Sequence, residues 1–218
     1  MNTIPMLTKL FPKTKNISEV AEILEKYSNF GINTNIRLAH FLAQVREEVG
    51  AELKPISENL NYTEEGLKKT FKVFRDSPEL AAKYGRKEKQ EANQEMIANI
   101  AYANKLGNGD ISSGDGYKYR GAGVLQITGK FNFEEVQRRI DKYAPTSNID
   151  IVLNPKDIHT LEGAILAGLG FWIKNDIYKI ADIGLAEKNV NEVTSIINKH
   201  TSSYKERYIH FSKIIALI

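Results

Sequence analysis

The sequence predicts a mainly α-helical fold of two lobes with a cleft between them and at most a small β-hairpin. Apolar residues recur at three- and four-residue steps along most of the chain, which is typical of helices with one buried face. The length of 218 residues suffices for one good core or for two lobes of one compact domain. We find no internal repeat and no low-complexity linker, so we expect a single domain over residues 1–218, with a large helical lobe and a smaller one.

The clearest helix is predicted between Asn35 and Gly50. Five apolar residues there form one stripe: Leu38, Phe41, Leu42, Val45 and Val49. Further helices are expected at 67–74, 96–103, 161–174, 190–198 and 204–215. Thr63 is the expected N-cap of one helix, and Gly107 is expected to end another.

Residues 107–123 depart from this pattern, because they hold six glycines among Asp, Ser and Tyr residues. Such a segment is either a flexible surface loop or backbone that must turn tightly or approach a ligand closely. It leads into the aromatic stretch 117–120 and the strand-like stretch 124–128. We therefore expect the small hairpin near residues 117–128.

Composition excludes several classes of function. The 30 basic and 27 acidic residues are spread along the chain, giving a net charge of +3 and a pI of about 8.8. This is a weak attraction to anionic surfaces such as cell-wall polymers, and far from a nucleic-acid-binding footprint. With no cysteine, the chain has no disulfide, thiolate nucleophile or cysteine zinc site.

The N-terminal residues 1–12 lack a basic start followed by an apolar run, so we expect no secretory signal. No later segment reaches the roughly 18 apolar residues that span a bilayer. We expect a protein made in the cytoplasm without a transmembrane segment.

Two glutamates stand out as candidates for acid and base chemistry. At about 100° per residue, Glu48 falls at the edge of the apolar stripe, while Glu47 is expected on the opposite face, toward water. Gln44 and Phe41 share the flank of Glu48 and could orient and desolvate it, which favours a neutral carboxyl and suits a general acid. The alternative is an ordinary structural glutamate at a helix edge.

The second candidate is Glu58, in the stretch 57–62 between Pro55 and the Thr63 cap. Asn61 and Tyr62 beside it offer amide and phenol groups suited to sugar hydroxyls and N-acetyl groups. A pair of carboxylates is what glycosidic bond cleavage needs. The alternative is a polar connection between helices.

Competing chemistries have less support. The four histidines show no HExxH or other close metal spacing, and each is expected to be a surface or half-buried structural residue. There is no Gly-x-Ser-x-Gly elbow, and the glycine-rich segment lacks the Gly-Lys-Ser/Thr ending of a P-loop. We expect no metal ion and no cofactor.

Four blocks, in order, resemble glycoside hydrolase family 19, the chitinase-like enzymes, in its branch of phage endolysins and bacterial wall hydrolases. Residues 41–50 (FLAQVREEVG) are similar to the family's FLAQ-x-x-H-E-S/T-G, and residues 58–63 (ENLNYT) to ENLNYS. The third block begins with residues 97–104 (IANIAYAN), similar to IAN-x-VYA. It continues through the glycine-rich segment to residues 119–129 (YRGAGVLQITG), similar to YRGRG-x-IQLTG. Residues 193–198 (VTSIIN), followed by Arg207, resemble a C-terminal motif that lines the family's cleft.

The resemblance implies a lysozyme-like helical fold and an inverting mechanism without a covalent intermediate. It implies Glu48 as general acid, Glu58 as general base and Thr128 as a group that holds the nucleophilic water. For inversion the two carboxyls should stand roughly 6.5–9.5 Å apart. The expected sugar-binding or orienting residues are Gln44, Asn61, Tyr62, Tyr119, Arg120, Gln126, Asn198 and Arg207.

This sequence also departs from the family pattern. Glu47 stands where the family usually has His, Val49 where it has Ser or Thr, and Tyr117 where it has Trp. Residues 198–200 are Asn-Lys-His instead of Asn-Gly-Gly, which puts sugar contacts in doubt more than the chemistry. The three expected catalytic residues are all present.

We expect an enzyme that cuts the glycan strands of peptidoglycan and acts as a monomer on the cell wall in the periplasm. Delivery would be through a holin, as for an endolysin, or by a secretion apparatus, as for an antibacterial effector that has an immunity protein. A chitinase is the second possibility, because both polymers have β-1,4-linked N-acetylhexosamines. A third is a catalytically silent glycan-binding module, against which the intact Glu48, Glu58 and Thr128 argue.

Overall fold

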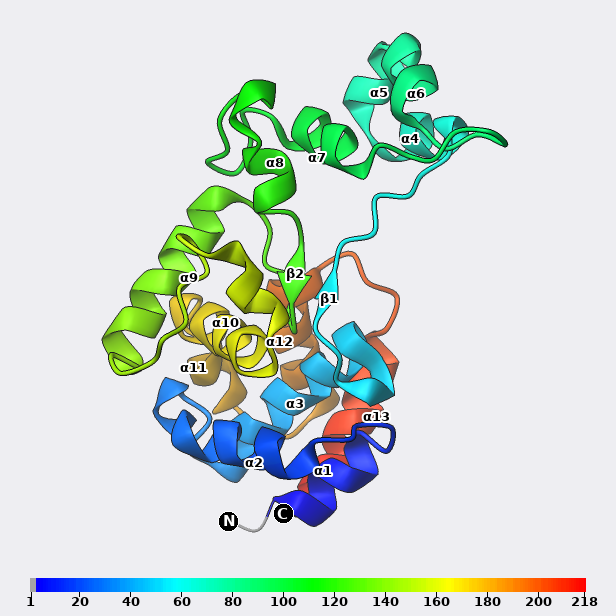
Figure 1. The fold of residues 1–218 in the computed structure, drawn as a ribbon. Coiled ribbons are helices and arrows are strands. Elements are labelled where there is room, and N and C mark those ends of the chain that lie inside the picture. The colour runs from blue at the N-terminus through cyan, green and yellow to red at the C-terminus, as the bar shows by residue number, and fades with distance from the viewer. Residues whose placement is uncertain (1–2) are drawn as a thin grey trace. The chain divides into compact units, whose positions relative to one another are not determined.

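The computed structural model describes residues 3–218 and is mainly α-helical, as predicted. Thirteen α-helices, four short 3-10 helices and a sheet of two short strands make up the regular structure of the described residues (Figure 1). Met1 and Asn2, the start of the N-terminal segment and of the predicted domain, lie outside the described residues. No helix within residues 3–218 is long and apolar enough to cross a membrane.

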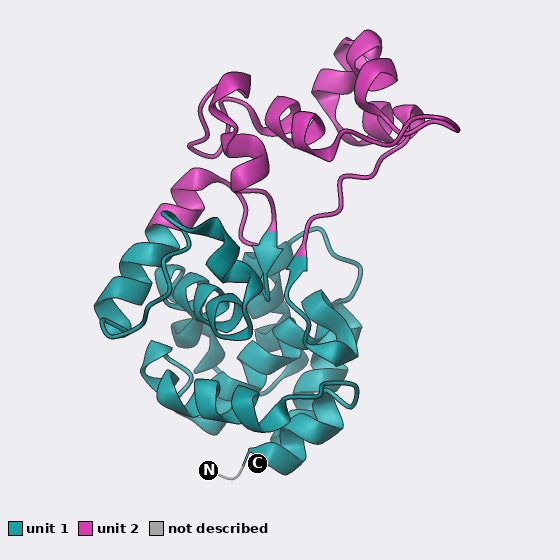
Figure 2. Ribbon diagram, viewed as in Figure 1, with its two compact units in different colours: residues 1–56, 122–126, 135–218 teal, residues 57–121, 127–134 magenta. Residues whose placement is uncertain are grey.

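The chain divides into two compact units (Figure 2). Unit 1 comprises residues 1–56, 122–126 and 135–218, and unit 2 comprises residues 57–121 and 127–134. Unit 2 is thus a helical insertion between the first and last parts of unit 1. The predicted cleft between two lobes stays a prediction.

Unit 1 is built around the apolar helix α10 (Leu161–Lys174), nine residues of which are buried. Trp172 anchors it, because its indole Nε1 donates a hydrogen bond to the Gly31 carbonyl at 3.1 Å and its ring meets Phe41 edge-on at 5.6 Å. Two glycines allow close packing here: a Cβ at Gly168 would lie 2.5 Å from Val124 Cγ2, and one at Gly170 would lie 2.8 Å from Val136 Cγ1. A glycine inside a helix costs roughly 1 kcal/mol, but here it lets Val124 and Val136 pack closely against α10.

Seven other α-helices lie wholly or mostly in unit 1. They are α1 (Ile4–Leu10), α2 (Ile17–Lys26), α3 (Asn35–Val49), most of α9 (Lys130–Tyr143), α11 (Ile177–Ala181), α12 (Glu187–Asn198) and α13 (Tyr204–Ile215). Two of them, α2 and α11, pack against α10. Helix α13 packs against α3. This contact brings the end of the chain to the predicted acid.

Unit 2 has its own apolar core, which includes Leu60, Leu67, Phe74 and Ile97. Its helices are α4 (Glu64–Thr70), α5 (Lys72–Asp76), α6 (Pro78–Tyr84), α7 (Gln94–Tyr102) and α8 (Asp115–Lys118). Thr63 caps α4 as predicted, since its hydroxyl accepts a hydrogen bond from the Gly66 N–H at 3.1 Å.

Two predicted helix boundaries are wrong. The helix expected at 67–74 breaks at Phe71, where the backbone is extended between α4 and α5. Helix α7 ends at Tyr102, so Gly107 does not stop it. Gly107 instead has a φ of +79°, and a Cβ there would lie 2.7 Å from Phe131 Cβ, so this glycine permits a tight loop against α9.

The predicted hairpin at 117–128 is also wrong. Strand β2 (Ala122–Gly123) pairs with the distant β1 (Ile56–Ser57), and the stretch 115–118 forms α8. The stretch expected as a strand at 124–128 turns instead, with Gln126 at a φ of +52°. Helix α9 was missed, although Phe133, Val136 and Ile140 recur at helical spacing and are buried.

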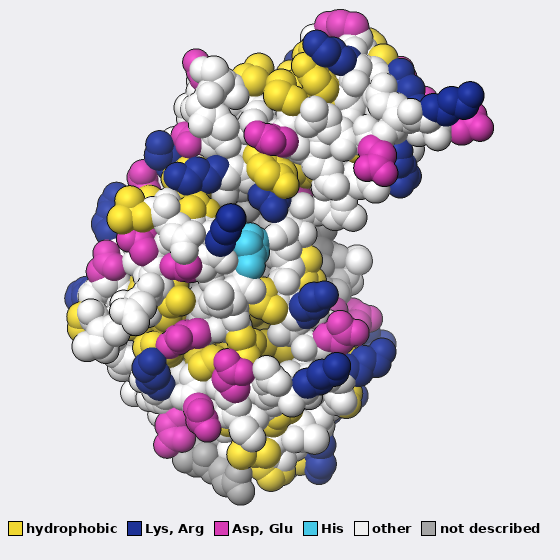
Figure 3. Space-filling model, in the orientation of Figure 1, with side chains coloured by type: hydrophobic (Ala, Val, Ile, Leu, Met, Phe, Trp, Pro, Cys, Tyr) yellow, Lys and Arg dark blue, Asp and Glu magenta, His cyan; other side chains and the backbone are white. Residues whose placement is uncertain are grey.

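Charged side chains of both signs are interspersed over the face of the molecule in Figure 3. This agrees with the even spread of charge along the sequence. The view shows no basic block of the kind that nucleic-acid binding requires.

Candidate active site

Glu48 lies in the last turn of α3 and is held by a cation from the end of the chain. The helix begins where predicted, because the Thr34 hydroxyl caps it by accepting from the Arg37 N–H. Arg207 on α13 donates from Nη2 to Glu48 Oε1 at 2.6 Å. Since the side chains of Arg207 and Glu48 are only 2% and 13% exposed, this ion pair is largely shielded from water.

A buried chain of hydrogen bonds fixes the Arg207 guanidinium from behind. Its Nη1 donates to Gln44 Oε1 at 2.8 Å, and Gln44 Nε2 donates to Thr194 Oγ1 at 3.0 Å. The Thr194 hydroxyl in turn donates a hydrogen bond to the Val190 carbonyl at 2.9 Å. Because arginine can only donate, the order of donors and acceptors is determined along the whole chain.

This arrangement favours the orienting role over the sugar-binding role for two predicted residues. Gln44 is fully buried and Arg207 is 2% exposed, so both orient Glu48 from beneath rather than forming an open sugar-binding surface. Desolvation of Glu48 by its flank was expected to favour a neutral carboxyl, but a guanidinium contacts the carboxylate directly.

Glu47 does not face water as predicted. It is half-buried, and its Oε1 lies 2.8 Å from His210 Nε2 on α13. Helical phase placed Glu47 opposite the core of its own helix, but α13 covers that side. Burial lowers the pKa of His210, opposed by the charge of Glu47 and reinforced by Arg46, so the imidazole donates to Glu47 as a neutral group.

His40 differs from the expected surface or half-buried histidine. It is completely buried on α3, its ring centroid 4.3 Å from that of Phe211, with Nε2 3.3 Å from the Gly184 carbonyl. Its Nδ1 has no hydrogen-bond partner among the described residues. Burial lowers the pKa of His40 to about 4, so this histidine is neutral near neutral pH.

Glu58 in unit 2 is held by neutral donors. The Tyr102 hydroxyl donates to Glu58 Oε1 at 2.6 Å, and the Gly121 N–H donates to Oε2 at 3.3 Å. The Glu58 N–H in turn donates to the Gly121 carbonyl at 2.7 Å. Burial raises the pKa of Tyr102, and the Glu58 carboxylate adds to this, so the phenol stays a proton donor.

The other predicted residues of unit 2 have varied surroundings. Tyr119 is buried against Phe133, at 5.2 Å between ring centroids, so it belongs to the packing of this unit. Arg120 is half-buried, stacks 3.9 Å over the Tyr117 ring and donates to the Tyr117 carbonyl at 2.7 Å. It directly precedes Gly121, a partner of Glu58.

The remaining predicted residues of unit 2 are accessible. Asn61 is exposed, and the half-buried Tyr62 meets Phe71 edge-on at 5.5 Å. Thr128 is half-buried, and its carbonyl accepts from Asn132 Nδ2 at 2.8 Å, which ties it to the first turn of α9.

In unit 1, Gln126 supports the strands while Asn198 is open to solvent. Gln126 Nε2 donates to the carbonyls of Ile56 and Gly123 at 3.0 and 3.2 Å, so this amide holds β1 to β2. Asn198, the last residue of α12, is exposed.

Three residues of these two sites were missed from the sequence: Thr194, Tyr102 and His210. Thr194 and Tyr102 lie inside the blocks 193–198 and 97–104, so their positions were marked without their roles. Only the packing of α13 against α3 could reveal His210. Among residues 3–218, no group of three or more His, Asp or Glu side chains is arranged to hold a metal ion.

The fold and these sites define a helical protein with one fixed carboxylate in each unit. No protein-family profile matches the chain. It is 34% identical over 192 residues to a glycosyl hydrolase family 19 domain-containing protein of Haemophilus influenzae, covering 87% of this chain and 86% of that protein. The chain therefore belongs to glycosyl hydrolase family 19.

Proposed function

We propose that this protein hydrolyses the glycan strands of peptidoglycan, with Glu48 as general acid and Glu58 as general base. The observation that carries the proposal is that each carboxylate is held from behind by its own unit. Arg207 fixes one oxygen of Glu48, and Tyr102 and Gly121 fix Glu58. Prior positioning of this kind is a major part of the catalytic effect of such groups.

In the proposed reaction Glu48 protonates the glycosidic oxygen as the bond to the anomeric carbon breaks. Glu58 removes a proton from a water molecule that attacks the anomeric carbon from the opposite face, with Thr128 holding that water. The products are a new reducing end and a free hydroxyl, and the configuration inverts. Inversion requires the two carboxyls to stand roughly 6.5–9.5 Å apart in the working enzyme.

Peptidoglycan is favoured over chitin as the substrate by two features. The block 58–62 (ENLNY) resembles the wall-hydrolase branch of the family, and the chain contains no cysteine for the bridges that we would expect of a secreted chitinase. We propose that the protein reaches the periplasm by holin-dependent release or through a secretion apparatus. The second route implies an immunity protein in the producing cell.

The test compares Glu48→Gln and Glu58→Gln with Glu47→Gln, the neighbouring glutamate on α3. On purified sacculi each of the first two should lower the release of reducing ends by about 10²–10⁴-fold, because a general acid or base is lost. Glu47→Gln should retain most activity. Equal losses in all three variants would show that charge or stability, not acid and base chemistry, explains the effect.

Mass spectrometry of the fragments tests the role of water. Hydrated N-acetylmuramic acid ends are expected, whereas anhydro ends would contradict a base that activates water. Faster hydrolysis of colloidal chitin than of sacculi would show that chitin, and not peptidoglycan, is the preferred substrate. If the protein binds sacculi but releases no reducing ends, it is a glycan-binding module and not an enzyme.

A further inference from the structure

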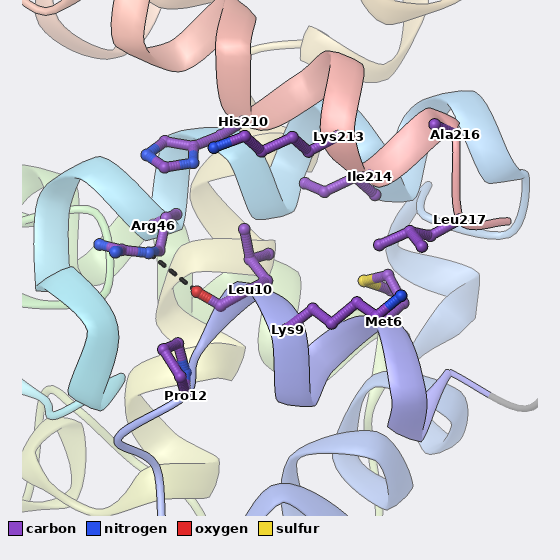
Figure 4. Close-up of a pocket in the computed structure, with 10 residues that line it drawn as sticks. All are labelled: Met6, Lys9, Leu10, Pro12, Arg46, His210, Lys213, Ile214, Ala216 and Leu217. Carbon is purple, nitrogen blue, oxygen red and sulfur yellow. Dashed lines mark hydrogen bonds between the residues drawn. The ribbon is translucent and has the colours of Figure 1, made fainter.

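A pocket of about 360 Å³ in unit 1 is used by none of the chemistry above. It lies between α1 and α13, with Arg46 of α3 at one side (Figure 4). None of the ten described residues that line it is acidic. Such pockets, apolar with a few convergent polar groups, are typical of small-molecule sites.

One end of this pocket is cationic. Arg46 and Lys213 supply the charge there, and the Lys213 side chain extends toward the His210 imidazole (Figure 4). This imidazole is neutral and already donates to Glu47 at 2.8 Å. Arg46 is fixed because its Nε donates to the Leu10 carbonyl at 2.9 Å. The charge of Glu47 favours protonation of His210, whereas the charges of Arg46 and Lys213 disfavour it, so all three groups act electrostatically on the imidazole.

The other end of the pocket is apolar apart from the exposed Lys9, whose side chain extends beside Met6 (Figure 4). Met6 and Ile214 form buried walls, being 2% and 1% exposed, while Leu217 is 41% exposed beside them (Figure 4). An apolar chain seated against Leu217 would remove this exposed surface from water. The pocket thus offers apolar contact at the end formed by Met6, Ile214 and Leu217, with Lys9 at its rim, and cationic groups at the other end.

The volume limits the size of the ligand. At about 30 Å³ per heavy atom, the share of a water molecule in the liquid, the pocket holds roughly twelve heavy atoms. A carboxylate with a chain of about ten carbon atoms has this size and polarity. A short anion would leave the apolar end wet, and a neutral chain would leave the cations without a partner.

We propose that this pocket binds a soluble single-chain anionic amphiphile, with its carboxylate at Arg46, His210 and Lys213 and its chain along Met6, Ile214 and Leu217. Bound ligand would lie about one helical turn from Arg207 on α13. The residues of this pocket take no part in the proposed glycan hydrolysis, so ligand binding here can be tested independently of that activity.

Calorimetric titration with three probes tests the recognition of both ends. Decanoate should bind at one site per chain. Butyrate, which has the charge without the chain, and decanol, which has the chain without the charge, should each bind at least about tenfold more weakly. If either binds as tightly as decanoate, the proposal is wrong. Binding to anionic phospholipid vesicles without binding of monomeric decanoate would also overturn it, in favour of adsorption to a membrane.

Matched variants locate the site. Lys213→Ala should weaken decanoate binding about tenfold through loss of one charge-assisted contact. Its control is Lys205→Ala, an exposed lysine on the same helix that does not line the pocket. Leu217→Ser should also weaken binding, with the exposed Ile209→Ser as control. Equal effects in variant and control would place the ligand elsewhere.

The imidazole of His210 gives an independent signal. A carboxylate beside it stabilises the protonated ring, so decanoate should raise the pKa of His210 measured by NMR, whereas decanol should not. An unchanged His210 titration at saturating decanoate would contradict the assignment of the head group.

Discussion

The two proposed catalytic carboxylates are held in opposite ways. Glu48 in unit 1 meets a buried guanidinium that is backed by an amide and a hydroxyl. Glu58 in unit 2 meets a phenol and a backbone N–H, both of them neutral. Both carboxylates accept charge-assisted hydrogen bonds, but only Glu48 also pairs with a buried opposite charge, and loss of that partner leaves a buried charge uncompensated. Unit 1 should therefore be much more sensitive to substitution at its site than unit 2.

The largest effect is expected from Arg207→Ala. It removes the cation from Glu48 and leaves Gln44 Oε1 without its donor, so the free energy of unfolding should fall by about 4 kcal/mol. Denaturant unfolding at neutral pH measures this change. Adding Glu48→Gln should recover part of the loss because the uncompensated charge is then gone; a double variant no more stable than Arg207→Ala would mean that Arg207 acts through packing alone.

Acid should also act selectively on unit 1, through His40. Its pKa of about 4 in the folded protein lies below the ordinary value of 6.5, so the unfolded chain takes up the proton first. The stability that neutral His40 contributes is fully present above pH 6.5 and is lost as the pH falls toward 4. This contribution changes no further below pH 4, and the total loss is roughly 3 kcal/mol. Unfolding free energies measured across this range should fall more steeply with acid in wild type than in His40→Phe, which keeps only the smaller contribution of other groups such as His210.

Hydrogen exchange at pH 5 and pH 7 sharpens this test. Amides of α3 and α13 should lose protection at the lower pH more than amides of α4 and α7. A uniform change over both units would assign the acid sensitivity to groups other than His40.

A smaller effect is expected from Thr194→Val. The substitution keeps the shape but removes the acceptor for buried Gln44 Nε2, which should cost about 2 kcal/mol of unfolding free energy. The turnover rate should also fall while the affinity for glycan is kept, because Arg207 loses its support rather than a sugar contact. Thr194→Ser retains the hydroxyl, and both properties should stay near wild type. Equal behaviour of the Val and Ser variants would show that the methyl group, not the hydroxyl, matters.

The smallest change in stability is expected in unit 2, from Tyr102→Phe. Water can replace the phenol beside the half-buried Glu58, so unfolding should become easier by only about 1 kcal/mol. The rate of glycan hydrolysis should fall about tenfold if the lost hydrogen bond worth about 1.4 kcal/mol positions the base. If Tyr102→Phe lowered the free energy of unfolding as much as Arg207→Ala, the site in unit 1 would be no more sensitive to substitution than the site in unit 2.

The sequence by itself determined the helical class and several elements to the residue. Helices α10 and α13 span 161–174 and 204–215 as predicted, and α3 ends one residue before Gly50, because apolar spacing and caps act locally. It also marked Glu48 and Glu58, once ordered blocks of residues were compared with a family.

Only the tertiary structure decided what surrounds those carboxylates. Arg207 is 159 residues from Glu48 and His210 is 163 from Glu47, so no local pattern could pair them. Helical phase shows only which face of a helix is apolar. The prediction that Glu47 faces water was wrong because α13 covers the polar face of α3. The pairing of β2 with β1, instead of a local hairpin, could not be predicted from local sequence either. These two strands are far apart along the chain, with most of unit 2 between them.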